Sequence, residues 1–100
     1  MHLVQLLLPV TDDGERFADV HRKLRDALAS RFGGVTAYSR SPAQGVWKPE
    51  GRGAVHDDEI LLEVVVEHLQ AEWWRELRHR LERALDQESI IIRTSAIQII

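Results

Sequence analysis

The segment from Phe32 to Trp47 constrains the fold of this chain more than any other part of the sequence. It begins Phe-Gly-Gly, and glycines at this place indicate the end of a helix, because glycine enters the left-handed conformation of a C-terminal cap without steric cost. A short strand is expected next, residues 41–44 predict a turn, and residues 45–48 predict a returning arm. A four-residue turn would pair Tyr38 with Trp47 on one face of this hairpin.

The other strands are indicated by alternation and by β-branched residues. Residues 59–68 alternate most clearly, with one side of the strand made by Ile60, Leu62, Val64 and Val66. Residues 3–10 and residues 89–100 predict the first and last strands, because both are rich in strand formers. Residues 49–58 carry a proline, two glycines and three acidic side chains, and they predict a surface loop.

Two stretches show helical periodicity instead. Apolar side chains recur every three or four positions between Phe17 and Phe32, and again between Trp74 and Leu85. The resulting order is β-α-β-(β)-β-α-β, in which the bracketed strand is the hairpin arm at 45–48. Two β-α-β halves joined through a central hairpin predict a ferredoxin-like α+β sandwich, with one antiparallel sheet and both helices on one face. One hundred residues, 44% of them hydrophobic, suit one domain over residues 1–100.

A resemblance can be added to this pattern. The sequence Phe-Gly-Gly-Val-Thr, followed by Gly-Val-Trp at 45–47 and a valine-rich strand flanked by glutamates, resembles small uncharacterised bacterial α+β proteins of ferredoxin-like fold. The likeness extends over residues 30–67. It implies the same fold and brings no assigned catalytic residue with it.

Two helices on one face leave the other face of the sheet open. Strand alternation places there Leu3, Gln5, Leu7, Thr36, Tyr38, Arg40, Leu61, Glu63, Val65, Glu67, Ile91, Arg93 and Ser95. An apolar surface of this extent is uncommon on a monomer, so the main prediction is self-association into a homo-oligomer, a dimer or larger. In such an interface Glu63 and Arg93 would be able to form a buried pair.

The same face is the predicted binding site for a small organic ligand. Tyr38 and Trp47 would make an apolar wall, and the convergent polar groups would be Gln5, Arg40, Glu63 and Arg93. The alternative is a cofactor-independent enzyme at this face. Glu63 or Glu67 would then act as general base, and Arg93 or Arg40 would stabilise an anionic intermediate.

Composition argues against several other partners. The net charge of −3 is unlike that of a nucleic-acid binder, and the arginines of residues 71–87 are interleaved with glutamates. The apolar runs are far shorter than the roughly 18 residues of a membrane helix. No cysteine is present, which suits a reducing compartment, so we expect a cytoplasmic protein that contacts neither nucleic acid nor membrane.

No metal or cofactor site is expected either. The run from His56 to Glu59 carries four possible metal ligands, but adjacent ligands in one loop are poorly arranged around an ion. The Gly-Arg-Gly sequence at 51–53 lacks the strand-to-helix context of a phosphate-binding loop. Residues 95–100 stay β-like, and we expect them to pair with a neighbouring strand of the same chain or of another subunit.

Overall fold

The structure is a computed structural model that describes residues 1–10, 14–47 and 55–100, and for residues 39–47 and 55–59 it describes the backbone alone. Six elements follow one another along the chain: β1 (His2–Pro9), α1 (Gly14–Phe32), β2 (Thr36–Trp47), β3 (Val55–Val66), α2 (Ala71–Ala84) and β4 (Ile91–Ala96).

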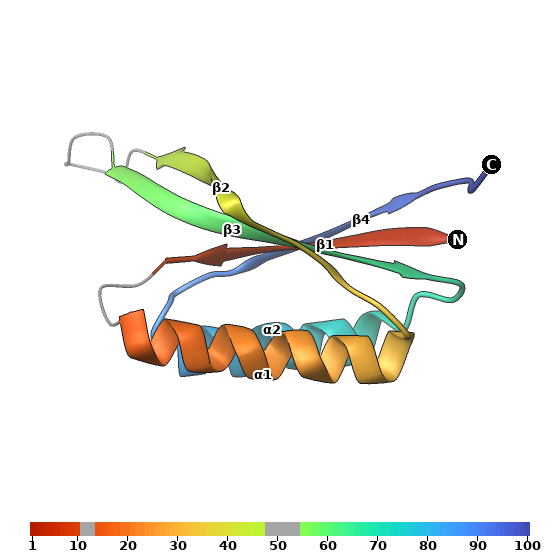
Figure 1. The fold of residues 1–100 in the computed structure, drawn as a ribbon, viewed down its shortest axis with the longest axis horizontal. Coiled ribbons are helices and arrows are strands. Elements are labelled where there is room, and N and C mark those ends of the chain that lie inside the picture. The colour runs from red at the N-terminus through yellow and green to blue at the C-terminus, as the bar shows by residue number, and fades with distance from the viewer. Residues whose placement is uncertain (11–13, 48–54) are drawn as a thin grey trace.

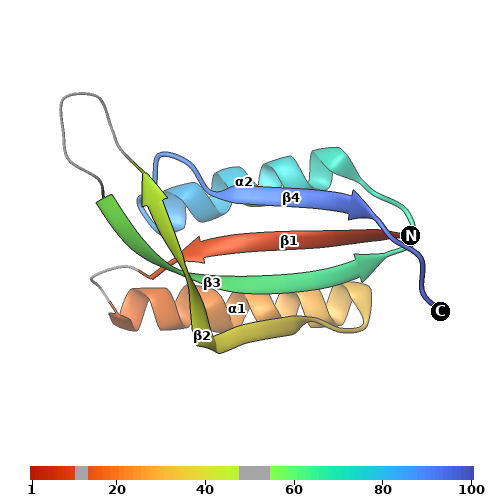
Figure 2. The same ribbon diagram turned by 90° about the horizontal axis from the view of Figure 1, so that it is seen from above.

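The four strands form one sheet in the order β2-β3-β1-β4, and every neighbouring pair is antiparallel. Both helices run beneath the same face of this sheet (Figure 1), and the strand order can be followed from above in Figure 2. The predicted ferredoxin-like α+β sandwich is therefore confirmed. Within the described part of the chain, neither helix has the length and apolar character needed to cross a membrane.

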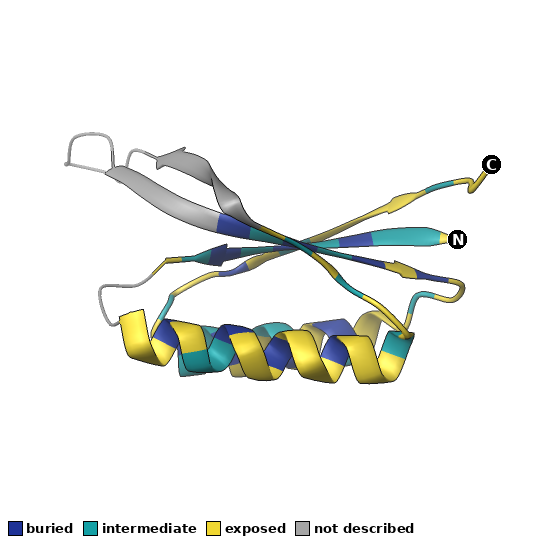
Figure 3. Cartoon of the chain, viewed as in Figure 1, coloured by how far each residue is buried: buried dark blue, intermediate teal, exposed yellow. Residues whose placement is uncertain are grey.

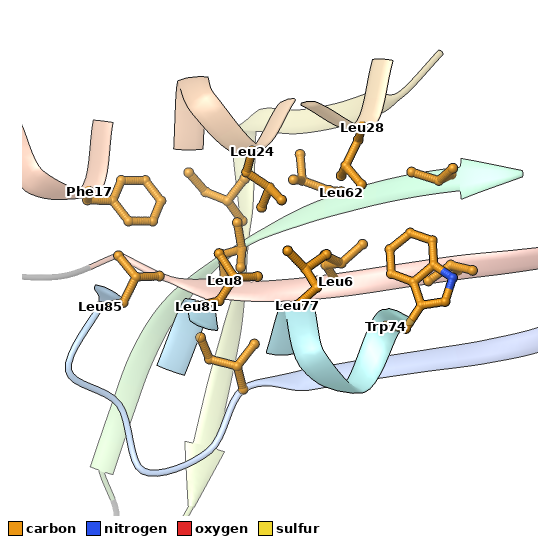
Figure 4. Packing of buried hydrophobic residues seen from close by; sticks show 14 of the residues in the cluster. Leu6, Leu8, Phe17, Leu24, Leu28, Leu62, Trp74, Leu77, Leu81 and Leu85 are labelled. Carbon is orange, nitrogen blue, oxygen red and sulfur yellow. The ribbon is translucent and has the colours of Figure 1, made fainter. Parts of the chain in front are cut away.

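The core lies between the sheet and the helices and follows the alternation of the sequence. Val4, Leu6 and Leu8 are fully buried on β1, and Leu62 is fully buried beside them on β3. The helices meet these strands with their apolar stripes, as Figures 3 and 4 show. The helical residues in this cluster are Phe17, Leu24, Leu28, Trp74, Leu77 and Leu81. The predicted inward faces of strands and helices are thus confirmed.

The two glycines end α1 as expected. Gly33 has a φ of 82°, and its amide donates to the Ala29 carbonyl at 2.9 Å. This is the left-handed cap that glycine adopts without penalty. Just before it, Phe32 stacks on Trp74 with 5.2 Å between ring centroids and meets the edge of Trp73 at 5.3 Å. The end of α1 is therefore tied to the first turn of α2.

The predicted hairpin within residues 35–48 is wrong. Strand β2 continues through residues 41–44, and Tyr38 lies opposite Leu61 of β3 instead of opposite Trp47. Five residue steps on β2, from Tyr38 to Ala43, face two steps on β3, so the pairing contains an irregularity of the bulge type. Pro42 falls in this irregular stretch of an edge strand, where a missing backbone N–H costs no ladder hydrogen bond.

The hairpin arm exists, but its second strand is β3. Residues 45–47 pair with residues 55–57, so β3 begins at Val55 and not at residue 59. Residues 55–58 of the predicted loop are therefore strand, while 48–54 lie outside the described residues. Past the irregularity, the arm leaves the plane of the sheet on the side away from the helices (Figure 1).

The last strand is shorter than predicted. β4 covers Ile91–Ala96 instead of residues 89–100. Pairing to β1 continues for one further bond, in which the Ile97 amide donates to the Met1 carbonyl at 3.0 Å. The segment after it is exposed, with Ile99 at 61%.

Candidate functional site on the open sheet face

The open face of the sheet is organised in three rows that run across the strands. The central row is polar, because strand register places Thr36, Glu63, Gln5 and Arg93 side by side on β2, β3, β1 and β4. The row on one side contains Val65 and Leu3. The row on the other side contains Tyr38, Leu61, Leu7 and Ile91. A polar row thus lies between two largely apolar ones.

Gln5 connects the charges of the polar row. Its amide Nε2 donates to Glu63 Oε1 at 2.9 Å, and its Oε1 accepts from Arg93 Nε at 2.9 Å. An amide has one acceptor end and one donor end, so Gln5 joins a guanidinium on one side to a carboxylate on the other. Each bond is assisted by a charge and is stronger than a neutral hydrogen bond. We call Glu63, Gln5 and Arg93 the polar triad.

A direct pair between Glu63 and Arg93 does not form within the chain. Strand β1 separates β3 from β4, and two strand spacings of about 4.8 Å keep the two positions about 10 Å apart. Sequence alternation shows that both residues share a face, but it carries no information on which strand lies between them. Their charges remain at opposite ends of the triad.

The apolar rows are incompletely covered in this chain. Tyr38, Val65 and Ile91 are 45%, 41% and 53% exposed, while Leu3, Leu7 and Leu61 are half-buried. These side chains cover the strands and face away from the helices. The predicted apolar open face is present on the residues whose side chains are described.

A cavity opens beside the triad at the end of the sheet where β1 begins. It has a volume of about 470 Å³, and its polar side chains are Glu63 and Thr36. The apolar side chains lining it are Leu3, Phe32, Val35 and Val65, and backbone is supplied by Gly33 and Gly34. The Phe-Gly-Gly-Val-Thr segment therefore forms one wall of the cavity, in addition to ending α1.

The structure brings together only part of the predicted site. Gln5, Glu63 and Arg93 form the triad, and Tyr38 lies in the next row. Trp47 lies nine residues further along β2, where its backbone is opposite Val55 and not opposite Tyr38. The side chains of Arg40 and Trp47 lie outside those described. Leu3, Val65 and the glycines were not predicted as cavity residues, although the first two were assigned to the open face.

No metal centre is formed by the side chains that the structure describes, since no three His, Asp or Glu side chains gather around a common point. The side chains of the acidic run at 56–59 lie outside this set. The chemistry available at the cavity is therefore that of one carboxylate, one hydroxyl, exposed backbone and apolar surface.

Comparison with known proteins identifies the fold. No protein-family model matches the sequence, and no curated protein matches it either. A phage SAM lyase in complex with S-methyl-5'-thioadenosine matches with a TM-score of 0.62 at 16% identity, over 94% of this chain and 79% of that one. The divalent cation tolerance protein CutA1 from Thermus thermophilus matches with a TM-score of 0.61 at 19% identity, over 97% and 84%.

A third solved structure, the PII-like protein CutA from Nostoc sp. PCC 7120 in apo form, has a TM-score of 0.58 at 16% identity, over 97% of this chain and 81% of that one. Identities this low show a shared fold and nothing more.

Proposed function

We propose that this protein is a small homo-oligomeric module of the cytoplasm that associates through its open sheet face and binds a small organic molecule in the cavity beside Glu63. One observation carries the proposal. A polar triad with opposite charges at its two ends lies between apolar rows and borders that cavity. The face thus offers both apolar surface and a charge pattern for a partner.

The partner that fits this face is a second copy of the same chain. When a second triad lies across the first in the opposite direction, Arg93 of each copy faces Glu63 of the other. The apolar rows on either side of the triad can then meet those of the partner. Charge complementarity sets the register of such a contact, while burial of the apolar rows supplies most of its free energy.

Association would also close the cavity. Leu3 and Val65 belong both to the apolar row and to the cavity wall. A copy packed on this row would cover the open side of the cavity and remove the bound molecule from water. The volume of about 470 Å³ lies within the ~300–1,000 Å³ range of ligand pockets.

The expected ligand has an apolar body and a hydrogen-bond donor for Glu63. The Glu63 carboxylate accepts one bond from Gln5 and keeps acceptor capacity for another donor. S-methyl-5'-thioadenosine, the ligand of the phage lyase with this fold, has such a body and an amino group. It is therefore the first probe for the cavity.

Self-association is tested by light scattering of Val65→Asp and Ile91→Asp. The wild type is expected to have a mass above that of one chain, and both variants are expected to be monomeric with an unchanged circular dichroism spectrum. Val10→Asp is the matched control, because Val10 is 45% exposed but follows the end of β1 in the core-facing register. A monomeric wild type, or variants that keep the oligomer mass, would contradict the proposal.

Ligand binding is tested by calorimetric titration of the oligomer with S-methyl-5'-thioadenosine. Glu63→Gln should weaken binding about tenfold, since a hydrogen bond to a charged group contributes about 1.5–3 kcal/mol. Glu88→Gln, a change at an exposed residue between α2 and β4, should leave the affinity unchanged. An absence of binding excludes a ligand of this kind. Equal affinities for wild type and Glu63→Gln exclude this cavity as the binding site.

A cofactor-independent enzyme at the same face is the second candidate, and the position of Glu63 at the cavity wall favours it. Glu63 would be the base, while Arg93, on the far side of Gln5, would act on a substrate long enough to cross β1. Loss of SAM on incubation with the protein, abolished in Glu63→Gln while the oligomer mass is kept, would favour this candidate. A SAM concentration that does not change would contradict an enzyme acting on SAM and would favour the binding module.

A further inference from the structure

A separate cavity lies on the helix side of the sheet, between α2 and the edge strand β4. It has a volume of about 280 Å³. Its apolar lining consists of Leu69, Trp74 and Ile92, and its polar lining includes Arg75, Arg78 and Thr94. Ile92 and Thr94 lie opposite Leu6 and Val4, so they share the core-facing side of the sheet and not the open face. The cavity is therefore distinct from the one beside Glu63.

The two arginines differ in how far their charge is compensated. Arg75 forms an ion pair with Glu72, one turn earlier on α2. Arg78 forms no ion pair with the described residues, and its Nε is buried without a hydrogen-bond partner among them. A buried donor without a partner has lost its hydrogen bond to water and gained none in return, so an acceptor in the cavity would stabilise it. The cavity wall thus carries one uncompensated positive charge with an unused donor.

The carboxylate one turn after Arg78 on α2 has other partners. Glu82, one turn further along α2, accepts from the Ile90 amide at 2.9 Å through Oε2 and lies 3.3 Å from His79 Nδ1 through Oε1. The other end of the cavity is the start of α2 at Ala71, where Gln70 makes no side-chain capping bond. Free amides at a helix start give a positive potential, which adds to the preference for an anion.

We propose that this cavity binds a small organic carboxylate with an apolar or aromatic body. The carboxylate accepts from the Arg78 guanidinium, whose planar donors match the two carboxylate oxygens. When the guanidinium turns toward the ligand, the unsatisfied Nε gains a hydrogen-bond partner. The Thr94 hydroxyl donates at the opposite wall. The body of the ligand packs on Trp74, Leu69 and Ile92. One uncompensated charge fits a monoanion, and the small volume fits a molecule with a single ring.

Phenylacetate is the probe, and phenylacetamide is its uncharged counterpart of the same shape. Titration of the ¹⁵N-labelled protein is expected to give saturable amide shifts at Ala71, Arg78 and Thr94. A ligand of about ten non-hydrogen atoms reaches a Kd of about 1 mM at ordinary ligand efficiency. Phenylacetamide should bind at least fivefold more weakly, since it cannot form a charge-assisted pair. Equal binding of both probes, or shifts that never saturate, would overturn the proposal.

Variants of Arg78 test whether its positive charge binds the carboxylate. Arg78→Met keeps the aliphatic stem and should weaken phenylacetate binding about tenfold, whereas Arg78→Lys should recover part of the affinity because it keeps the charge. Arg80→Met is the matched control on α2, since Arg80 is exposed and does not line the cavity. If Arg78→Met misfolds, Thr94→Val supplies the test, with a loss of affinity expected and no effect contradicting the site. An unchanged affinity in a folded Arg78→Met overturns it as well.

Discussion

His21 is the buried polar side chain of α1, and its environment favours the neutral ring. It is 9% exposed, its ring stacks on Phe17 with 5.7 Å between centroids, and Nε2 has no hydrogen-bond partner among the described residues. Burial lowers the pKa of His21 below its ordinary value of 6.5, and the charge of Arg25 lowers this pKa further. The unfolded chain therefore binds a proton at this residue more readily than the folded chain does.

This difference predicts a pH dependence of stability. The contribution of His21 is complete above pH 6.5 and is lost as the pH falls through the lowered pKa of the folded state. The free energy of unfolding, measured in urea between about pH 7.5 and pH 5, should fall less in His21→Leu than in the wild type. His68→Gln, at an exposed position, should keep the slope of the wild type.

Equal slopes for His21→Leu and the wild type would contradict this account. Asp19 does not affect this comparison. Its pKa is lowered from 3.8, chiefly by its hydrogen bond to Lys23, so its contribution to stability is lost only at a more acidic pH.

At the scale of elements, the C-terminal cap of α1 connects fold and site. Gly33 and Gly34 are adjacent, line the same cavity and have open space where a Cβ would be placed. They differ in backbone conformation, because only Gly33 has a positive φ, at 82°. Substitutions at the two positions therefore test the effect of backbone conformation alone, because an added Cβ meets no neighbour at either one.

Gly33→Ala should lower the free energy of unfolding by about 1–2 kcal/mol, the cost of a left-handed conformation for a residue with a Cβ. Gly34→Ala, which meets no neighbour, should change it little or raise it by about 0.5 kcal/mol through the unfolded state. Urea unfolding of both variants provides the measurement. Equal effects of the two substitutions would show that the positive φ of Gly33 is not what selects glycine there.

The segment after β4 is the second part of the chain whose role in association can be tested. Ile97 is bonded to Met1, whereas Ile99 and Ile100 are exposed apolar residues beyond the strand. Deletion of residues 97–100 should weaken the proposed oligomer, because it removes apolar surface available to a neighbouring chain. Light scattering over a dilution series measures the effect. If the concentration at which half of the oligomer dissociates is unchanged, association depends on the sheet face and not on this segment.

At the scale of the whole molecule, the fold has one covered face and one uncovered face. The helices bury Val4, Leu6 and Leu8 on the inner side of β1 completely, while residues of the outer side of the sheet remain half-buried or exposed. One chain therefore leaves apolar rows in contact with water that a second chain would cover. Stability and association are then linked, since a partner that binds only the folded chain shifts the folding equilibrium.

Linkage predicts a melting temperature that rises with protein concentration. The wild type should melt at a higher Tm as its concentration increases, because the proposed oligomer would dissociate when its chains unfold. Val65→Asp should remove this dependence, whereas Val10→Asp should keep it. Scanning calorimetry at several concentrations gives the comparison. A wild-type Tm that is independent of concentration would show that one chain is the folding unit.

The sequence by itself determined both helices, the first, central and last strands apart from their ends, and the side of each that faces the core. Alternation in residues 60–66, the apolar stripes of α1 and α2, and the cap at Gly33 are local patterns, and the structure confirms them. The placement of Glu63 and Arg93 on one face also follows from local parity, as does the exposure of Val65 and Ile91. These features depend only on neighbours a few residues apart.

Tertiary structure alone decided how these elements meet. The order β3-β1-β4 places Gln5 between Glu63 and Arg93, and an edge position allows β2 to continue past Pro42. The cavity beside Glu63 is formed by β1, β3 and the end of α1, which are distant in the sequence. Strand order and register result from contacts between remote segments, whereas periodicity reports only which side of a segment is buried.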